Sequence, residues 1–289
     1  MPDASEPSRV TLECRELSAG YHGRRVLDRI SFRLGEPAIY VLLGPNVAGK
    51  TTLFRAIAGI LRPYTGSVSV GGRPADHPEA RARLHFLSHL DGLPDGLRVD
   101  EALGLYAAVE GATSPDVERV LRLLEIESLR HRFVSELSAG QKKRVAVARI
   151  FLRERDVYLL DEPTANLDPK AASEIRDLVL RLSRNRLVLY SSHNLFEARE
   201  IGTYVLALKD GRLSLFDRIA DLRAAKFVVG VRAWAGGEML ASAPRRGEYA
   251  LFELSGPEAV AGLIRELETK GVQLREIREM GNPLEDLFA

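Results

Sequence analysis

The sequence has few of the features that direct a chain to the cell exterior or into a membrane. Its 289 residues include one cysteine, Cys14, so no internal disulfide is possible and a reducing compartment is favoured. We expect Cys14 to be a small buried residue of the first strand. No uncharged apolar run reaches the roughly 18–20 residues that span a bilayer. The first residues, MPDASEPSRV, contain no signal-peptide core.

The chain also lacks an excess of charge of either sign, since its formal net charge is +1. A balanced surface offers no basic footprint for nucleic acid, and we expect no nucleic-acid partner. These absences together predict a cytoplasmic protein. If it acts on a membrane, a different protein must cross that membrane.

The apolar residues, 45% of the chain, alternate between buried-strand runs and helical periodicity. This alternation predicts an α/β sheet with helices on both faces. The predicted strands are Val10–Leu17, Ile30–Leu34, Ala38–Leu43, Val157–Leu160, Leu187–Tyr190 and Tyr204–Lys209. The predicted helices are Thr51–Leu61, Val99–Val109, Asp116–Leu124, Lys142–Leu152 and Ala171–Leu182.

The pattern also divides the chain into parts. Residues 1–8 look like a loose leader, and residues 9–223 form the main domain. Within it, residues 75–155 are mostly helical and interrupt the alternation. The composition changes near Asp221–Lys226, so we expect a small α+β domain over 224–289, with a strand at Phe227–Trp234, a second strand and a helix at Pro257–Lys270.

A glycine-rich loop follows the Ala38–Leu43 strand and precedes a helix. It reads Gly44-Pro-Asn-Val-Ala-Gly49-Lys50-Thr51-Thr52, which matches the phosphate-loop pattern in the context that the pattern requires. Backbone N–H groups of such a loop surround phosphate oxygens, Lys50 reaches the β- and γ-phosphates, and the Thr51 hydroxyl holds Mg²⁺. The predicted ATP-contacting residues here are Gly44, Asn46, Val47, Ala48, Gly49, Lys50, Thr51 and Thr52.

Two acids end the apolar strand before Pro163. Asp161 fits an acid that binds the Mg²⁺ shell, and Glu162 is placed to polarise an attacking water. His193 follows a later strand, where α/β folds bind ligands. Alternatively, the acids are a solvated strand end and the histidine is structural.

The segment Leu137-Ser138-Ala139-Gly140-Gln141 precedes a helix that begins with basic residues. Ser138 and Gln141 have the spacing of a helix capping box, and the same cap exposes N–H groups to an anion. Asp168-Pro169 is typical of a helix cap. We expect Asp168 to be that and also a contact across a dimer.

Together these motifs resemble the ABC ATPase family over about Arg9–Arg223. The resemblance implies an ABC P-loop core with an N-terminal antiparallel β portion. It makes Ser138, Gly140 and Gln141 the signature, with Ala139 in place of a glycine, Asp161 and Glu162 the Walker B acid and catalytic glutamate, Asp168 part of the D-loop, His193 the switch histidine, and Tyr21 the aromatic that stacks on adenine. It further implies Mg²⁺ and ATP as cofactors, a head-to-tail dimer that sandwiches two ATP molecules, and a separate membrane permease at the inner face of the membrane.

Two residues depart from the family pattern. Val47 stands where glycine is usual, and a β-branched residue disfavours positive φ, so we expect Val47 to restrain the loop. The family's metal-contacting glutamine has no counterpart, because the two glutamines are Gln141 and Gln273. His89 aligns best with that place and becomes a candidate metal contact, as in haem-exporter ATPases, which are shorter.

The end of the chain, Asn282-Pro-Leu-Glu-Asp-Leu-Phe288, resembles the C-terminal extension of ATPases that serve drug, lipid or polysaccharide exporters. We therefore expect the ATPase of an exporter. Two alternatives stay open: a soluble ABC protein in an assembly role, such as iron–sulfur cluster assembly, and a nucleotide-dependent regulator that hydrolyses ATP weakly. Translation-type ABC proteins carry two ATPase halves, and DNA-repair types carry long coiled coils, which this sequence does not.

Overall fold

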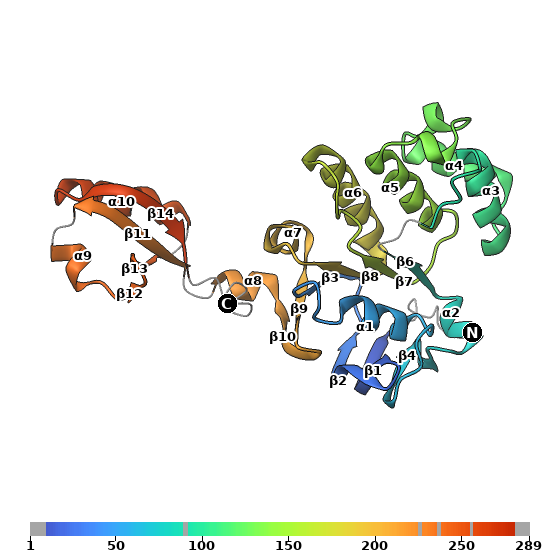
Figure 1. Cartoon of the computed structure of the whole chain (residues 1–289), viewed down its shortest axis with the longest axis horizontal. Coiled ribbons are helices and arrows are strands. Elements are labelled where there is room, and N and C mark those ends of the chain that lie inside the picture. The colour runs from blue at the N-terminus through green and yellow to red at the C-terminus, as the bar shows by residue number, and fades with distance from the viewer. Residues whose placement is uncertain (1–9, 89–91, 225–226, 236–237, 255–256, 281–289) are drawn as a thin grey trace, which may run out of the picture. The chain divides into compact units, whose positions relative to one another are not determined.

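The computed structural model describes residues 10–88, 92–224, 227–235, 238–254 and 257–280. The chain forms two compact units, Met1–Phe216 and Asp217–Ala289, each with a hydrophobic core (Figure 1). The first unit ends at Phe216, before the expected domain boundary after Arg223. Helix α8 (Ile219–Ala224) therefore falls within the second unit. The expected leader lies outside the described residues.

A six-stranded sheet forms the centre of the first unit. In spatial order its strands are β10 (Arg212–Arg218), β9 (Tyr204–Lys209), β3 (Ala38–Leu43), β8 (Leu187–Ser192), β7 (Val157–Asp161) and β6 (Leu84–Leu87). Strand β3 is parallel to β8 and β9, and the pairs β8–β7 and β7–β6 are also parallel. Every residue of β3, β7 and β8 is buried, as expected for parallel strands covered on both faces.

A second, antiparallel sheet lies beside it and confirms the expected N-terminal β portion. Its strands are β2 (Arg24–Leu34), β1 (Leu12–Tyr21), β4 (Thr65–Val70) and β5 (Arg73–Pro74), in that order. Helix α1 (Lys50–Ile57) packs against both sheets, and its Leu53 and Phe54 are fully buried in their common core. Cys14 lies in this core as expected, and burial raises the pKa of its thiol.

The region between β6 and β7 is helical (Figure 1). It contains α3 (Val99–Glu110), α4 (Ser114–Leu123), α5 (Ala139–Ala148) and the 3₁₀ turns η1 (Glu127–Leu129), η2 (Val134–Glu136) and η3 (Arg149–Phe151). The expected helical stretch over 75–155 was too wide, because β6 lies inside it and pairs with β7. Four residues are too few to show a strand by periodicity. Before β6 comes the short helix α2 (Pro78–Arg81).

Two further helices of the first unit follow β7 and β8. After β7 comes α6 (Pro169–Leu182), which continues into η4 (Ser183–Asn185), and after β8 comes α7 (Leu195–Ile201). Helix α6 begins and ends close to the prediction. It lies on the face of the six-stranded sheet opposite α1 (Figure 1). Among the helices that the structure describes, none combines the length and apolar character needed to cross a membrane.

The second unit is the expected α+β fold. Its antiparallel sheet has the order β12 (Arg245–Arg246), β13 (Tyr249–Leu254), β11 (Phe227–Ala235), β14 (Gln273–Glu279). Helix α10 (Val260–Thr269), preceded by η5 (Pro257–Ala259), buries Leu263 and Leu267 in the same core as Val229 and Val231. Helix α9 (Glu238–Ser242) and strand β14 were not predicted. The segment Asn282–Phe288 lies outside the described residues.

Candidate active site

The phosphate loop joins β3 to α1 and contains two glycines that the surrounding structure requires. Gly49 has φ 104°, and a Cβ there would come within 2.8 Å of Leu27 Cδ2. A Cβ at Gly44 would lie 2.5 Å from the carbonyl oxygen of Leu208. Only glycine fits both positions, so the backbone packs closely at both ends of this loop, the cradle for which phosphate binding is predicted.

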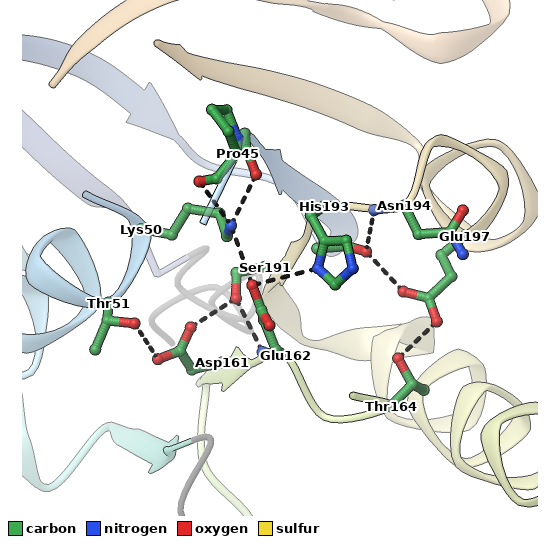
Figure 2. Close-up of polar contacts among 12 residues, drawn as sticks. Pro45, Lys50, Thr51, Asp161, Glu162, Thr164, Ser191, His193, Asn194 and Glu197 are labelled. Carbon is green, nitrogen blue, oxygen red and sulfur yellow. Dashed lines mark hydrogen bonds and ion pairs between the residues drawn. The ribbon is translucent and has the colours of Figure 1, made fainter. Parts of the chain in front are cut away.

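Lys50 is the cation at the centre of this cradle. Its side chain is 4% exposed, and Nζ donates hydrogen bonds to the carbonyl oxygens of Gly44 at 2.7 Å and Pro45 at 3.2 Å (Figure 2). The same Nζ lies 3.0 Å from Glu162 Oε1. Lys50 therefore connects the phosphate loop directly to the predicted catalytic glutamate.

Asp161 and Glu162 lie at the end of β7, next to the end of β8. The Thr51 hydroxyl donates to Asp161 Oδ2 at 2.7 Å, and the Ser191 hydroxyl donates to Asp161 Oδ1 at 2.7 Å (Figure 2). Glu162 N donates in turn to Ser191 Oγ at 2.9 Å. The parallel register that pairs Asp161 with Ser191 produces this arrangement. Glu162 itself has φ 47°, a strained conformation of the kind that occurs at functional sites.

His193 follows β8 and completes the group. Its Nδ1 lies 3.6 Å from Glu162 Oε1, and its side chain is about half exposed. A cavity of ≈ 140 Å³ adjoins the pair and is lined by Glu162, Thr164, Ala165, Asn166, Ser192, His193, Asn194 and Glu197. The predicted residues Lys50, Thr51, Asp161, Glu162 and His193 are thus brought together at the carboxyl ends of β3, β7 and β8.

The other predicted loop residues differ in exposure. Asn46 and Val47 are exposed, whereas Ala48 and Thr52 are buried. In the part of the chain that the structure describes, Val47 is not among the non-glycine residues with positive φ, and its side chain is 92% exposed. The expected restraint of the loop at position 47 is therefore wrong, because this backbone conformation is open to a β-branched residue.

The donor atoms beside the loop fit Mg²⁺. The Thr51 hydroxyl and the Asp161 carboxylate are neighbouring oxygen ligands, and Mg²⁺ usually completes its shell with water and substrate phosphates. Within the described ranges, no cluster of three or more His, Cys, Asp or Glu side chains forms a metal site of its own. The site thus suits a cation that arrives with a nucleotide. His89, the other predicted metal contact, lies outside the described residues, and its role stays a prediction.

Tyr21 ends β1, where it meets α1. Its hydroxyl accepts a hydrogen bond from Arg55 at 3.0 Å, and the Arg55 guanidinium carbon lies 5.9 Å from the ring centroid. These contacts fix the tyrosine beside the helix that begins at the phosphate loop. Its stacking on adenine stays a prediction.

The signature segment forms the predicted helix cap. Ser138 Oγ accepts from Gln141 N at 3.3 Å, and Gln141 Oε1 accepts from Ser138 N at 3.0 Å. A Cβ at Gly140 would lie 3.2 Å from the Cβ of Ala171, so glycine lets α5 approach α6 closely. The interpretation of Ser138 and Gln141 as a capping box is confirmed. An anion-binding role at this helix end stays a prediction.

Asp168 likewise caps α6, because its Oδ1 accepts from the backbone N–H groups of Lys170 and Ala171, each at 3.0 Å. This confirms the cap that the Asp-Pro pair predicted. The expected contact of Asp168 across a dimer interface is not tested by a single chain.

Four polar residues around Glu162 and His193, the predicted catalytic pair, were not predicted from the sequence. Ser191 and Ser192 end a buried strand, and their position beside His193 was a usable signal. Glu197 lies on a separate segment and accepts hydrogen bonds from the hydroxyl groups of Ser192 and Thr164. Spacing along the chain gave no sign of that contact.

Comparison with known proteins identifies the family. The family model described as "ABC transporter" matches residues 27–165. The chain is 36% identical over 213 residues to an energy-coupling factor transporter ATP-binding protein of Methanoculleus marisnigri, which covers 70% of this chain and 77% of that protein.

Two other relatives carry names of opposite transport direction. One is an sn-glycerol-3-phosphate import ATP-binding protein of Chromobacterium violaceum, 31% identical over 293 residues, 96% of this chain and 79% of that protein. The other is a cytochrome c biogenesis ATP-binding export protein of a Chelativorans species, 33% identical over 185 residues, 64% of this chain and 92% of that protein.

The fold and the site together define a P-loop ATPase with the ABC arrangement of motifs. The chain belongs to the ATP-binding subunits of ABC transporters, and it is an ATPase of that family.

Proposed function

We propose that the chain binds Mg-ATP between its own phosphate loop and the signature of a second copy, and that hydrolysis drives a separate permease. The observation that carries this proposal is the joined group of Lys50, Thr51, Asp161, Glu162 and His193. The signature Ser138 lies on a different helix, where its hydrogen bonds with Gln141 form a local cap. An exposed cap of this kind suits a phosphate presented by another subunit.

In the proposed reaction, a water oxygen attacks the γ-phosphorus and the bond to the β–γ bridging oxygen breaks, giving ADP and phosphate. The Glu162 carboxylate accepts the proton of the attacking water. Lys50 stabilises the charge on the phosphate oxygens. Thr51 and Asp161 would hold Mg²⁺, which would supply further positive charge there. We assign to His193, which lies 3.6 Å from Glu162, the γ-phosphate contact that the family resemblance implies.

Two findings support a permease partner. The described part of the chain contains no helix fit to cross a membrane, and the family consists of transporter subunits. We place the subunit on the cytoplasmic face of the membrane and favour export. The export direction rests on the resemblance of the C-terminal segment and on the export relative. The relative named for import is the reason that direction needs its own test.

The dimer is tested with Glu162→Gln. This variant keeps the shape of the side chain but removes the base, so it should bind ATP, fail to cleave it, and elute as a dimer with Mg-ATP on size exclusion with light scattering. Lys50→Ala/Glu162→Gln is the matched control and should remain monomeric, because it lacks the phosphate-binding cation. A monomer at saturating Mg-ATP from Glu162→Gln alone would contradict the proposal.

The partner is tested by co-expression with a multi-helix membrane protein, chosen from the genes that neighbour this one. The subunit should then move to the membrane fraction and copurify with that protein. Recovery in the soluble fraction alone would favour the assembly-factor alternative. Uptake or efflux of the cargo by inside-out vesicles, once a cargo is known, decides the direction.

A further inference from the structure

The carboxylate of Glu197 lies buried at the start of α7 and is surrounded by hydroxyl groups. Its side chain is 7% exposed. Thr164 Oγ1 donates to Oε1 at 2.6 Å (Figure 2). Ser192 Oγ donates to Oε2 at 2.7 Å, and the Tyr190 hydroxyl lies 3.3 Å from Oε2. A buried carboxylate is costly unless it is hydrogen-bonded. This one is supplied with partners on both oxygens.

Two of the hydrogen-bond partners of Glu197 come from the segments that carry Glu162 and His193, the predicted catalytic pair. Thr164 follows Glu162 by two positions, and Ser192 directly precedes His193. A third segment, α6, supplies Arg176, whose Nη1 lies 3.7 Å from Glu197 Oε1 and balances its charge. Glu197 therefore joins the chain that leaves β7 to the chain that leaves β8, although it lies in neither strand.

The same hydroxyls also shape the turn that carries His193. Ser192 Oγ accepts a hydrogen bond from Asn194 N at 2.9 Å. This bond links the two residues that flank His193. The ≈ 140 Å³ cavity beside the catalytic pair is bounded by Thr164, Ser192 and Glu197 as well as by Glu162 and His193. Glu162 stands in a strained conformation, and such residues persist where the surrounding structure holds them.

We propose that Glu197 is a positioning residue for hydrolysis, which sets the separation of Glu162 and His193 through Thr164 and Ser192. This inference rests on the proposed ATP hydrolysis. Glu197 does not belong to the phosphate loop, and its hydrogen bonds run to Thr164, Ser192 and Tyr190. We therefore expect it to act on the chemical step and not on nucleotide binding.

The test is steady-state ATP hydrolysis by full-length Glu197→Gln, which keeps the side-chain volume but turns half of the acceptor pair into a donor. We expect kcat to fall on the order of 10- to 100-fold, since small displacements of catalytic groups have effects of that size. KM for ATP should stay within about twofold, because Lys50 and Tyr21 are untouched.

Glu110→Gln is the matched control. Glu110 is also a carboxylate that joins separate segments, with Arg155 at 2.7 Å and His85 Nδ1 at 3.8 Å, but it contacts neither Glu162 nor His193. It should leave kcat unchanged. An equal kcat for wild type and Glu197→Gln overturns the inference, and so does an equal loss in both variants. If Glu197→Gln does not yield folded protein, Thr164→Val decides by the same criterion, because it removes one hydroxyl donor and keeps the volume.

A double-mutant cycle with His193→Ala separates positioning from general stability. If Glu197 acts through His193, adding Glu197→Gln to His193→Ala should lower kcat much less than it does in the wild type. If the two losses multiply, Glu197 does not act through this pair, and the inference fails. Failure of the proposed function looks different: wild type itself then hydrolyses no ATP, or Glu162→Gln does not dimerise with ATP.

Discussion

The two halves of the candidate ATP site differ in how their polar groups are used. On the phosphate-loop side, Lys50 and Thr51 at the start of α1 contact Asp161 and Glu162 at the end of β7, and Ser191 of β8 holds Asp161. On the signature side, Ser138 and Gln141 bond to each other within a single turn. The first half is a group of contacting side chains from separate segments, and the second is a helix end that is complete as a cap.

This difference indicates where each half obtains its function. The phosphate-loop half has a cation, acids and a histidine in reach of one another, so it contains the groups for binding and cleavage. The signature half has an uncommitted helix N-terminus and no acid or lysine in its cap. In the function proposed above, it gains a role when a second subunit brings a phosphate to it.

The largest expected effect is on the phosphate-loop side. Lys50→Ala removes the buried cation that contacts the loop carbonyls and Glu162. We expect hydrolysis to fall about 100- to 1000-fold, the range for loss of a group that stabilises transition-state charge. ATP affinity should fall as well. Isothermal titration and phosphate release measure both, and wild-type affinity in this variant would show that the loop half does not bind nucleotide.

The second prediction separates the cap from the anion site. Ser138→Asp keeps an excellent N-cap but places a negative charge where a phosphate should dock. We expect hydrolysis to fall on the order of 10- to 100-fold, with unchanged thermal stability and unchanged ATP binding to the monomer. Ser138→Asn, a neutral cap, is the control and should lose far less. Equal activity of the two variants would leave the signature only its capping role.

Much of the loop half could be predicted from the sequence, because its motifs are contiguous. Glycine at 44 and 49, lysine at 50 and the acids at 161 and 162 are each fixed by local backbone demands or by strand ends. The register of β7 on β8, and with it the pairing of Asp161 with Ser191, depends on tertiary packing. The same holds for the network of Glu197, which joins residues from three segments.

The fold was predicted where apolar runs are long and failed where they are short. Strands β3, β7 and β8 were found because parallel, fully buried strands are continuously apolar. Strands β4 to β6, β10, β12 and β14 were missed, since short or half-exposed strands leave little periodicity. In the second unit, α9 is five residues long and carries too little pattern to predict.

A smaller effect is expected from His89, the candidate metal contact of the loop half. An unperturbed histidine titrates near pH ~6.5, and imidazolium cannot accept a hydrogen bond from Mg²⁺-bound water. Turnover of the wild type should therefore fall about tenfold from well above to one pH unit below that pKa, and His89→Gln should flatten this fall.

Comparing the pH profile of the wild type with that of His89→Gln removes the contributions that the other histidines make to both profiles. Burial lowers the pKa of His85, so the unfolded state takes up a proton more readily than the native state, and stability decreases as the pH falls through the ordinary histidine pKa. This effect is common to both proteins. Superimposable profiles between about pH 5.5 and 8 would remove His89 from the metal site.

The smallest effect is expected at Val47. Because its side chain is exposed and its φ is not positive, Val47→Gly relieves no strain. Turnover and ATP affinity should stay within about twofold of wild type, as for most exposed substitutions. A gain of tenfold in either quantity would show that valine does restrain the loop, contrary to its conformation here.

The central claim, that one subunit's loop half works with another's signature half, is tested by mixing two inactive variants. Lys50→Ala keeps an intact signature, and Ser138→Asp keeps an intact phosphate loop. In an equal mixture, half of the dimers are mixed and each has one complete site, so hydrolysis should recover to roughly a quarter of wild type. A mixture that stays as inactive as its components would contradict the shared site.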